Sequence, residues 1–272
     1  MNLFSFFVLL LLPALTYAKG SRSDENLVAI GQGISSPTLT STVNFSSGYT
    51  HENPLGTIYQ NSFRVTGEYD TSNENDSNGN RSSGSGAELG YGTGHAGVAA
   101  GYYKRNCTGC DGRWAGSAGV AGNAIGAGLR YEKDILTVGV LFNPLGLHRF
   151  GLIAETNDSQ GSGAKITTYG AGYAHVANDW TFAIDGSKRN YENSSTYADR
   201  ILLTPGVSVR ADFLQITLND KITLRDRDND LVSDERTKHE VWFGVGGGGD
   251  SWHLVGYSKY VSDVALALSF FF

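Results

Sequence analysis

The chain ends on the stretch Asp263-Val264-Ala265-Leu266-Ala267-Leu268-Ser269-Phe270-Phe271-Phe272. Apolar residues occupy every second position from Val264 to Phe272, so in a strand they line a single face. A soluble protein rarely ends in this way, because a flat apolar edge strand invites aggregation. A strand that closes a barrel has no free edge, and its apolar face can contact lipid. The ordinary alternative is the terminal strand of an exported β-sandwich.

This stretch resembles the C-terminal strand of outer-membrane β-barrel proteins, whose terminal Phe and alternating apolar residues are read by the barrel-insertion machinery. The resemblance assigns that signal to Phe270 and Phe272. It also implies a location in the outer membrane of a Gram-negative-type bacterium. The partners that it implies are outer-membrane lipid, lipopolysaccharide and the barrel-assembly machinery.

The N-terminal residues have the pattern of an export signal. Residues 4–12 form an apolar run that is too short to span a membrane, and Thr16-Tyr17-Ala18 places small residues where a signal peptidase requires them. We therefore predict a signal peptide over residues 1–18 that is cleaved after Ala18. No Lys or Arg precedes the apolar run, which departs from the usual pattern.

Composition excludes several classes of protein. Beyond residue 18 there is no run of eighteen apolar residues, and the mean hydropathy is -0.22, which excludes a helical membrane protein. The 36 Gly, 14 Tyr and 13 Phe favour short strands, tight turns and aromatic girdles. The net charge of -6 provides no basic surface for nucleic acid.

Alternation of apolar and charged residues begins at Phe63. Phe63, Val65 and Tyr69 share one face of a strand, whereas Arg64 and Glu68 lie on the other. Charges on the second face are unfavourable in a sandwich core but suit a wet lumen behind a lipid-facing wall. Several strands repeat this pattern, and the predicted lumen charges are Arg64, Glu68, Arg130, Glu132, Asp185 and Arg210. A network of mutually satisfied charges is favoured over a substrate path.

Connections can be assigned because outer-membrane barrels have short periplasmic turns and longer outer loops. We assign residues 105–120 to an outer loop and residues 132–134 to a periplasmic turn. Asn143-Pro144-Leu145-Gly146 breaks the regular order, so we interpret residues 135–155 as one long strand, kinked at Pro144 where the ladder lacks a donor. The count is then about twelve strands, within a range of about ten to fourteen.

These observations predict an all-β fold, a transmembrane antiparallel up-and-down β-barrel over residues 61–272. Residues 19–60 do not alternate cleanly, and they form either a plug inside the barrel or a periplasmic segment.

Two motifs in the predicted outer loops could carry chemistry. Cys107-Thr108-Gly109-Cys110 is a CxxC, and in an exported chain with two Cys we predict a disulfide between Cys107 and Cys110. Residues 226–235 resemble a calcium loop, with candidate ligands Asp226, Asp228, Asp230 and Asp234. Leu231 replaces the expected Gly and Thr237 the expected Glu, so a solvated acidic loop is favoured over a calcium site, and no other cofactor is predicted.

Enzymatic chemistry is not supported. Asp76-Ser77-Asn78-Gly79 is similar to the Ser-Asn-Gly segment of outer-membrane phospholipases, but Asn75 stands where that family has its His, so the Ser lacks a base. The six His are scattered without an HxxxH pairing, which gives no support for a metal centre.

Asn53-Pro54-Leu55-Gly56 and the following strand from Tyr59 to Val65 resemble the Asn-Pro-Ala-Gly segment and first strand of the FadL family of outer-membrane transporters for hydrophobic compounds. The resemblance implies that the N-terminal residues form a hatch inside the barrel, and residues 19–60 are similar to that hatch in length. It also implies a kinked strand that opens a lateral exit, which Pro144 could provide, and it fits the terminal Phe272. The chain is shorter than the family's usual length, and twelve strands would be fewer than the family's fourteen.

Two functions are consistent with these patterns. The first is passive transport of small hydrophobic compounds across the outer membrane, with no ligand-binding residue identifiable. The alternative is a structural or surface-interaction barrel whose outer loops, rich in Asn, Ser, Gly and Asp, form the contact surface.

Overall fold

The computed structural model describes residues 29–38, 53–59, 62–75, 81–106, 111–160, 164–192, 200–226, 239–259 and 263–272. The predicted signal peptide and the Cys107–Cys110 disulfide lie outside these residues. So do Asp228, Asp230 and Asp234 of the predicted calcium loop, whereas Asp226 is the last residue of a strand. No described helix is long and apolar enough to cross a membrane.

The described residues form one short 3₁₀ helix and fourteen strands. Their bounds are η2 Pro54–Tyr59, β1 Phe63–Asn75, β2 Arg81–Gly92, β3 Ala96–Arg105, β4 Arg113–Ala121, β5 Ile125–Glu132, β6 Ile135–Phe142, β7 His148–Gln160, β8 Ala164–Val176, β9 Trp180–Glu192, β10 Arg200–Ala211, β11 Leu214–Asp226, β12 His239–Gly249, β13 Trp252–Lys259 and β14 Asp263–Phe271.

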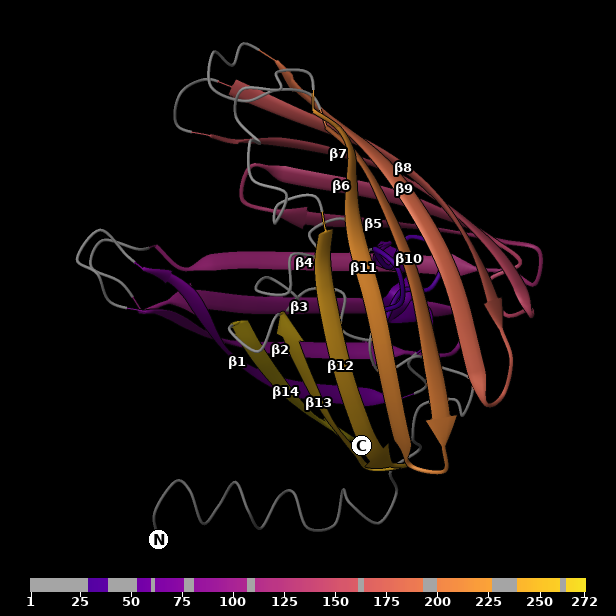
Figure 1. Ribbon diagram of the computed structural model, residues 1–272. Helices are drawn as coiled ribbons and strands as arrows, with labels where there is room; N and C mark the ends of the chain where they lie inside the picture. The colour runs from indigo at the N-terminus through magenta and orange to yellow at the C-terminus, as the bar shows by residue number, and fades with distance from the viewer. Residues whose placement is uncertain are drawn as a thin grey trace, which may run out of the picture.

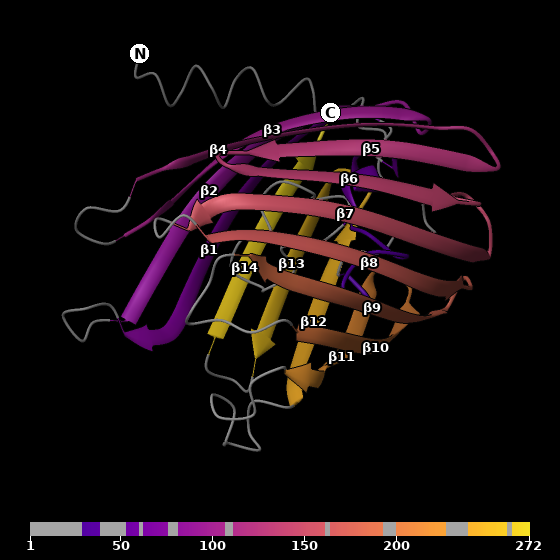
Figure 2. The ribbon, with the colours of Figure 1, turned by 90° about the horizontal axis from the view of Figure 1, so that it is seen from above.

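The strands form a closed barrel in which each strand pairs with its neighbours in sequence (Figures 1 and 2). The antiparallel pairing of β1 with β14 closes the ring, with a register that runs from Arg64 opposite Phe271 to Thr71 opposite Val264. The predicted all-β antiparallel barrel is therefore confirmed. The prediction of about twelve strands is wrong, because the described residues form fourteen.

Side chains alternate between the two faces of the wall. In β14, Leu266 is 47% exposed, whereas Ala265 is 5% exposed. In β1, Phe63 and Tyr69 are exposed, whereas Arg64 is fully buried on the inner face. Most of the exposed large side chains of the other strands are also apolar, which suits a wall that faces hydrocarbon and would be unfavourable in water.

The strand count was wrong for two reasons that together kept it even. Residues 113–120, predicted to be loop, form β4 together with Ala121, although their Gly, Ala and Ser content gives them little intrinsic strand preference. Residues 135–155, predicted to be one kinked strand, form β6 and β7, so Pro144 lies in the turn between them. Each error removed one strand, and the short and long connections therefore still alternated in the twelve-strand scheme.

Short turns gather at one end of the barrel, where the described wall also begins and ends at Phe63 and Phe272. These turns occupy residues 93–95, 122–124, 143–147, 177–179, 212–213 and 250–251. The turn at residues 133–134 is equally tight, with Asp134 at φ 66°, but it lies at the opposite end and not on the predicted periplasmic side. The strands beside it, β5 and β6, have 8 residues each, whereas β7 has 13.

Residues 29–38 and 53–59, hereafter the N-terminal segment, lie between the walls of the barrel (Figures 1 and 2). Residues of this segment bond to inward-facing side chains of β9 and β11, and η2 packs on strands β2 to β6. Because the contacts of the segment are with the inner wall, its position determines what space the lumen offers.

Candidate functional site: the seat of the N-terminal segment

Asp185 of β9 is the main anchor of the N-terminal segment. Its side chain is fully buried on the inner face of the wall. The Oδ2 atom accepts hydrogen bonds from the backbone N–H groups of Gln32 and Ile34, at 2.8 and 3.0 Å. The Oδ1 atom accepts from Ser35, at 2.6 Å from the hydroxyl and 3.3 Å from the backbone nitrogen. One carboxylate thus satisfies three backbone N–H groups that have no partner in a sheet.

Local geometry makes this arrangement possible. Gly31 and Gly33 have φ values of 70° and 72°, a backbone conformation that other residues rarely adopt, and they curl the segment so that its N–H groups point at one carboxylate. Gly172 lies directly opposite Asp185 on β8, and a Cβ at that position would overlap the Asp185 carboxylate. The anchor therefore depends on Gly on both sides of it.

Asn219 of β11 is a second anchor. Its side-chain oxygen accepts from the Gly31 N–H at 2.9 Å, and its side-chain nitrogen donates to the Ala29 carbonyl at 3.0 Å. This two-way pairing satisfies both ends of the amide, as a buried Asn requires. Asp185 and Asn219 thus hold the segment against both neighbours of β10.

The wall behind this part of the segment is interrupted. The pairing of β10 with β11 runs through Leu203 opposite Ile222 and resumes at Gly206 opposite Asn219, so Thr204 and Pro205 are skipped. Pro205 has no backbone N–H to donate to the ladder. On the outer face, Asp220 and His239 form a polar pair at 3.0 Å beside this break, where an apolar pair would be expected in a lipid-facing wall.

The second part of the N-terminal segment lies on a row of glycines. Gly92, Gly97, Gly119, Gly128 and Gly139 are direct cross-strand partners from β2 to β6, and all five are buried on the inner face. Helix η2 packs on the same five strands. A Cβ at Gly139 would overlap the Asn53 side chain, and one at Gly128 would lie 3.2 Å from the Leu55 nitrogen. The row leaves the space that η2 occupies.

Asn53, the first residue of the Asn-Pro-Leu-Gly motif, links the two parts of the segment to each other and to the wall. Its side-chain nitrogen donates to the carbonyls of Ile34 and Val140, each at 3.2 Å, and its side-chain oxygen accepts from the Leu55 N–H. The motif that suggested a family resemblance therefore has a structural role in placing η2.

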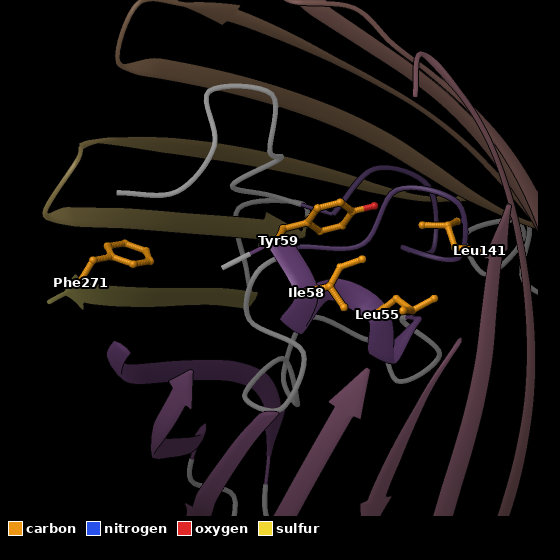
Figure 3. Packing of buried hydrophobic residues seen from close by; sticks show 5 residues of the cluster. All are labelled: Leu55, Ile58, Tyr59, Leu141 and Phe271. Atoms are coloured by element: carbon orange, nitrogen blue, oxygen red, sulfur yellow. The ribbon is translucent and has the colours of Figure 1, made fainter. Parts of the chain in front are cut away.

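An apolar cluster holds the end of η2. Leu55, Ile58 and Tyr59 of η2 pack with Leu141 of β6 and Phe271 of β14 (Figure 3). The Tyr59 hydroxyl donates to the Pro144 carbonyl at 2.9 Å and accepts from the buried Arg149 at 3.2 Å. Pro144 therefore contributes to the seat of η2 from a turn, and does not kink a strand.

The predicted lumen charges all lie on the inner face, in separate groups. Arg64 pairs with Glu88, a partner that the sequence pattern did not indicate, and both side chains are fully buried. Arg130 donates to Glu132 at 2.9 Å. Arg210 lines a small crevice with Gln215 and Ser208, and Glu68 is buried in β1. Asp185 contacts the N-terminal segment.

Several charged side chains lie together on the inner face of β11, β12 and β13, toward the end of the barrel opposite the short turns. The Glu240 carboxylate lies 3.5 Å from the Lys221 ammonium and 3.3 Å from the Lys259 ammonium. Lys259 also lies over the Trp242 ring, 5.8 Å from its centre. The inner wall is thus polar beyond the segment and apolar beneath η2.

Three features of the site were not predicted from the sequence: the role of Asn219, the glycine row and the interrupted pairing at Pro205. Residues 90–139 are visibly rich in Gly, with 13 in 50 positions, but the row exists only once the register is known. The rule that a strand proline interrupts a ladder is correct, but it applies to Pro205 and not to Pro144.

No protein-family model matches the sequence, and no curated protein matches it. Solved structures of three hydrocarbon transport proteins share the fold. The "CymD monoaromatic hydrocarbon channel" has a TM-score of 0.56 at 11% identity, over 91% of this chain and 99% of that one. A deletion mutant of the "TodX monoaromatic hydrocarbon channel" has a TM-score of 0.53 at 11% identity, over 90% and 97%. The Ralstonia pickettii toluene transporter TbuX has a TM-score of 0.51 at 10% identity, over 91% and 100%.

Proposed function

We propose that this protein is an outer-membrane channel for passive transport of small hydrophobic compounds, and that the N-terminal segment is its plug. The observation that carries the proposal is the bonding of the segment to Asp185 and Asn219 over the interrupted β10–β11 ladder. The likeness in fold to channels for toluene and other monoaromatic hydrocarbons supports the substrate class. The predicted signal peptide, cleaved after Ala18, supports export.

The proposed route enters the lumen from the loop end and leaves sideways between β10 and β11. A hydrophobic solute gains by passing from the lumen directly into hydrocarbon, because it then never crosses the aqueous periplasmic end of the barrel. Gly31 lies against this part of the wall, since a Cβ added to it would be 3.2 Å from the Thr204 carbonyl oxygen. When the N-terminal segment leaves this position, the stretch of β10 that is not paired with β11 is therefore open to the lumen.

Solute uptake tests this function. The barrel should be placed in vesicles with lipopolysaccharide in the outer leaflet, since an apolar solute crosses a plain phospholipid bilayer unaided. We expect uptake of labelled toluene to be faster than in vesicles without protein, and faster still after deletion of residues 29–38. Toluene and a fatty acid should both be tested, with the folded full-length barrel and with the folded deletion variant. If neither protein takes up either solute faster than protein-free vesicles do, the surface-interaction role is the better explanation.

Pro205→Val tests the lateral exit. Val restores a backbone N–H, so the β10–β11 ladder can continue through this position, and one added hydrogen bond should stabilise the barrel by about 1 kcal/mol. We expect slower toluene uptake with unchanged ion conductance, because ions follow the lumen and not the wall. Unchanged uptake in a variant with the expected gain in stability would exclude an exit at Pro205.

A further inference from the structure

Two histidines that are distant in sequence become neighbours on the outside of the barrel. His148, the first residue of β7, is the direct cross-strand partner of His175, near the end of β8. Their rings lie 4.8 Å apart, and their Nδ1 atoms are 3.5 Å apart. The pair faces outward at the end of the barrel that carries the short turns, where His148 is exposed and His175 is half-buried.

The spacing of the two nitrogens is that of two ligands on one metal ion. Two imidazole nitrogens at about 2.0–2.1 Å from a tetrahedral Zn²⁺ lie about 3.4 Å apart. Both Nδ1 atoms can act as ligands when each ring is neutral and carries its proton on Nε2. Water can supply the remaining positions, because the pair lies at the edge of the wall and not in its apolar centre.

Tyr173 is the third group at this place. Its hydroxyl lies 2.8 Å from His148 Nδ1, closer than two ligands of one tetrahedral Zn²⁺ ion lie. In the metal-free protein the Tyr173 hydroxyl shares a hydrogen bond with the nitrogen that a metal ion would use, and the hydroxyl is the donor when His148 carries its proton on Nε2. Binding of the ion requires this hydrogen bond to be given up, while His175 keeps its place against the Trp180 ring, 4.9 Å away.

We propose that His148 and His175 form a binding site for a divalent ion of the zinc and copper class, which prefers imidazole nitrogen. The bound ion links β7 to β8 at the short-turn end and stabilises their pairing. The site is independent of the plug and of transport through the lumen.

Copper titration of detergent-solubilised, tag-free protein tests the site. Cu²⁺ quenches a nearby tryptophan, so binding at this pair should quench Trp180. We expect saturable quenching at one equivalent in the wild type, and affinity about a hundredfold weaker in His148→Ala and His175→Ala, since two ligands on one scaffold bind far more tightly than one. Electron paramagnetic resonance should show two coordinating nitrogens in the wild type and one in each variant.

Three further variants make the result specific. His95→Ala removes an exposed histidine at the same end, whose ring lies by the Ala121 carbonyl, and should bind Cu²⁺ like the wild type. Trp180→Phe should keep the resonance spectrum but lose most of the quenching. Tyr173→Phe should bind at least as tightly as the wild type. Wild-type affinity in both single His variants, or an equal loss in His95→Ala, would overturn the proposal.

Discussion

Asp185→Ala is expected to raise the open fraction of the channel about a hundredfold. The substitution removes the acceptor of the Gln32, Ile34 and Ser35 backbone N–H groups. Each buried donor left without a partner costs about 1–3 kcal/mol, so the plugged state should lose about 3 kcal/mol or more relative to a state in which water solvates the segment. Every 1.4 kcal/mol changes the equilibrium tenfold. Single-channel recording in planar bilayers measures the open fraction directly.

Asp70→Ala is the matched control for this variant. Asp70 is also a buried carboxylate of the inner wall, but its partner is the Tyr103 hydroxyl at 2.6 Å. We expect some loss of barrel stability from Asp70→Ala and the same low open fraction as in the wild type. If both variants open the channel to the same extent, Asp185 acts through general destabilisation of the wall and not through the segment.

Gly151→Val is expected to open the channel by steric exclusion. Gly151 faces inward on β7, and a Cβ at this position would overlap the carbonyl oxygen of Ile34. The Cβ is fixed to the backbone of β7 and the atom that it overlaps is a backbone oxygen, so no side-chain rotation relieves the overlap. The Ile34 carbonyl, which must move, also accepts a hydrogen bond from the Asn53 side chain. The segment should leave its seat while the strand, which favours Val, remains paired. Conductance should match that of Asp185→Ala.

Gly67→Val is the control for the added side chain. Gly67 lies on the exposed outer face of β1, where a Cβ would meet nothing within 4 Å. This variant should conduct like the wild type. The Gly151→Val protein should first be shown to be folded, by its migration as a barrel in unboiled gel samples. If this folded variant keeps a closed channel, the lumen has room for both Val and the segment, which contradicts the close approach of Ile34 to Gly151.

The faces of the strands could be predicted from the sequence because their period is local. Val264 to Phe272 and Phe63 to Tyr69 indicate which side meets lipid, and the inner residues Arg64, Arg130 and Asp185 followed from the same alternation. The count failed at Arg113–Ala121 because small residues form a strand there only with the support of both neighbours.

The site could be predicted only in part, because it depends on register. Nothing local to Asp185 indicates that it meets residues 32–35, which are about 150 positions away in the chain. His148 and His175 likewise lack any spacing that a motif could detect, yet they are direct partners across β7 and β8. Pairing of distant strands created both the anchor and the histidine pair.

Hydrogen–deuterium exchange over residues 29–38, measured on the folded barrel in lipid nanodiscs, is the most direct test of the claim that this segment is bonded inside the lumen. We predict slow exchange of four backbone amides, each of which has a side-chain acceptor on the wall: Gly31, Gln32, Ile34 and Ser35. Exchange of these amides should be faster in Asp185→Ala. Complete exchange at the shortest labelling time in the wild type, while the amides of β9 stay protected, would contradict the account.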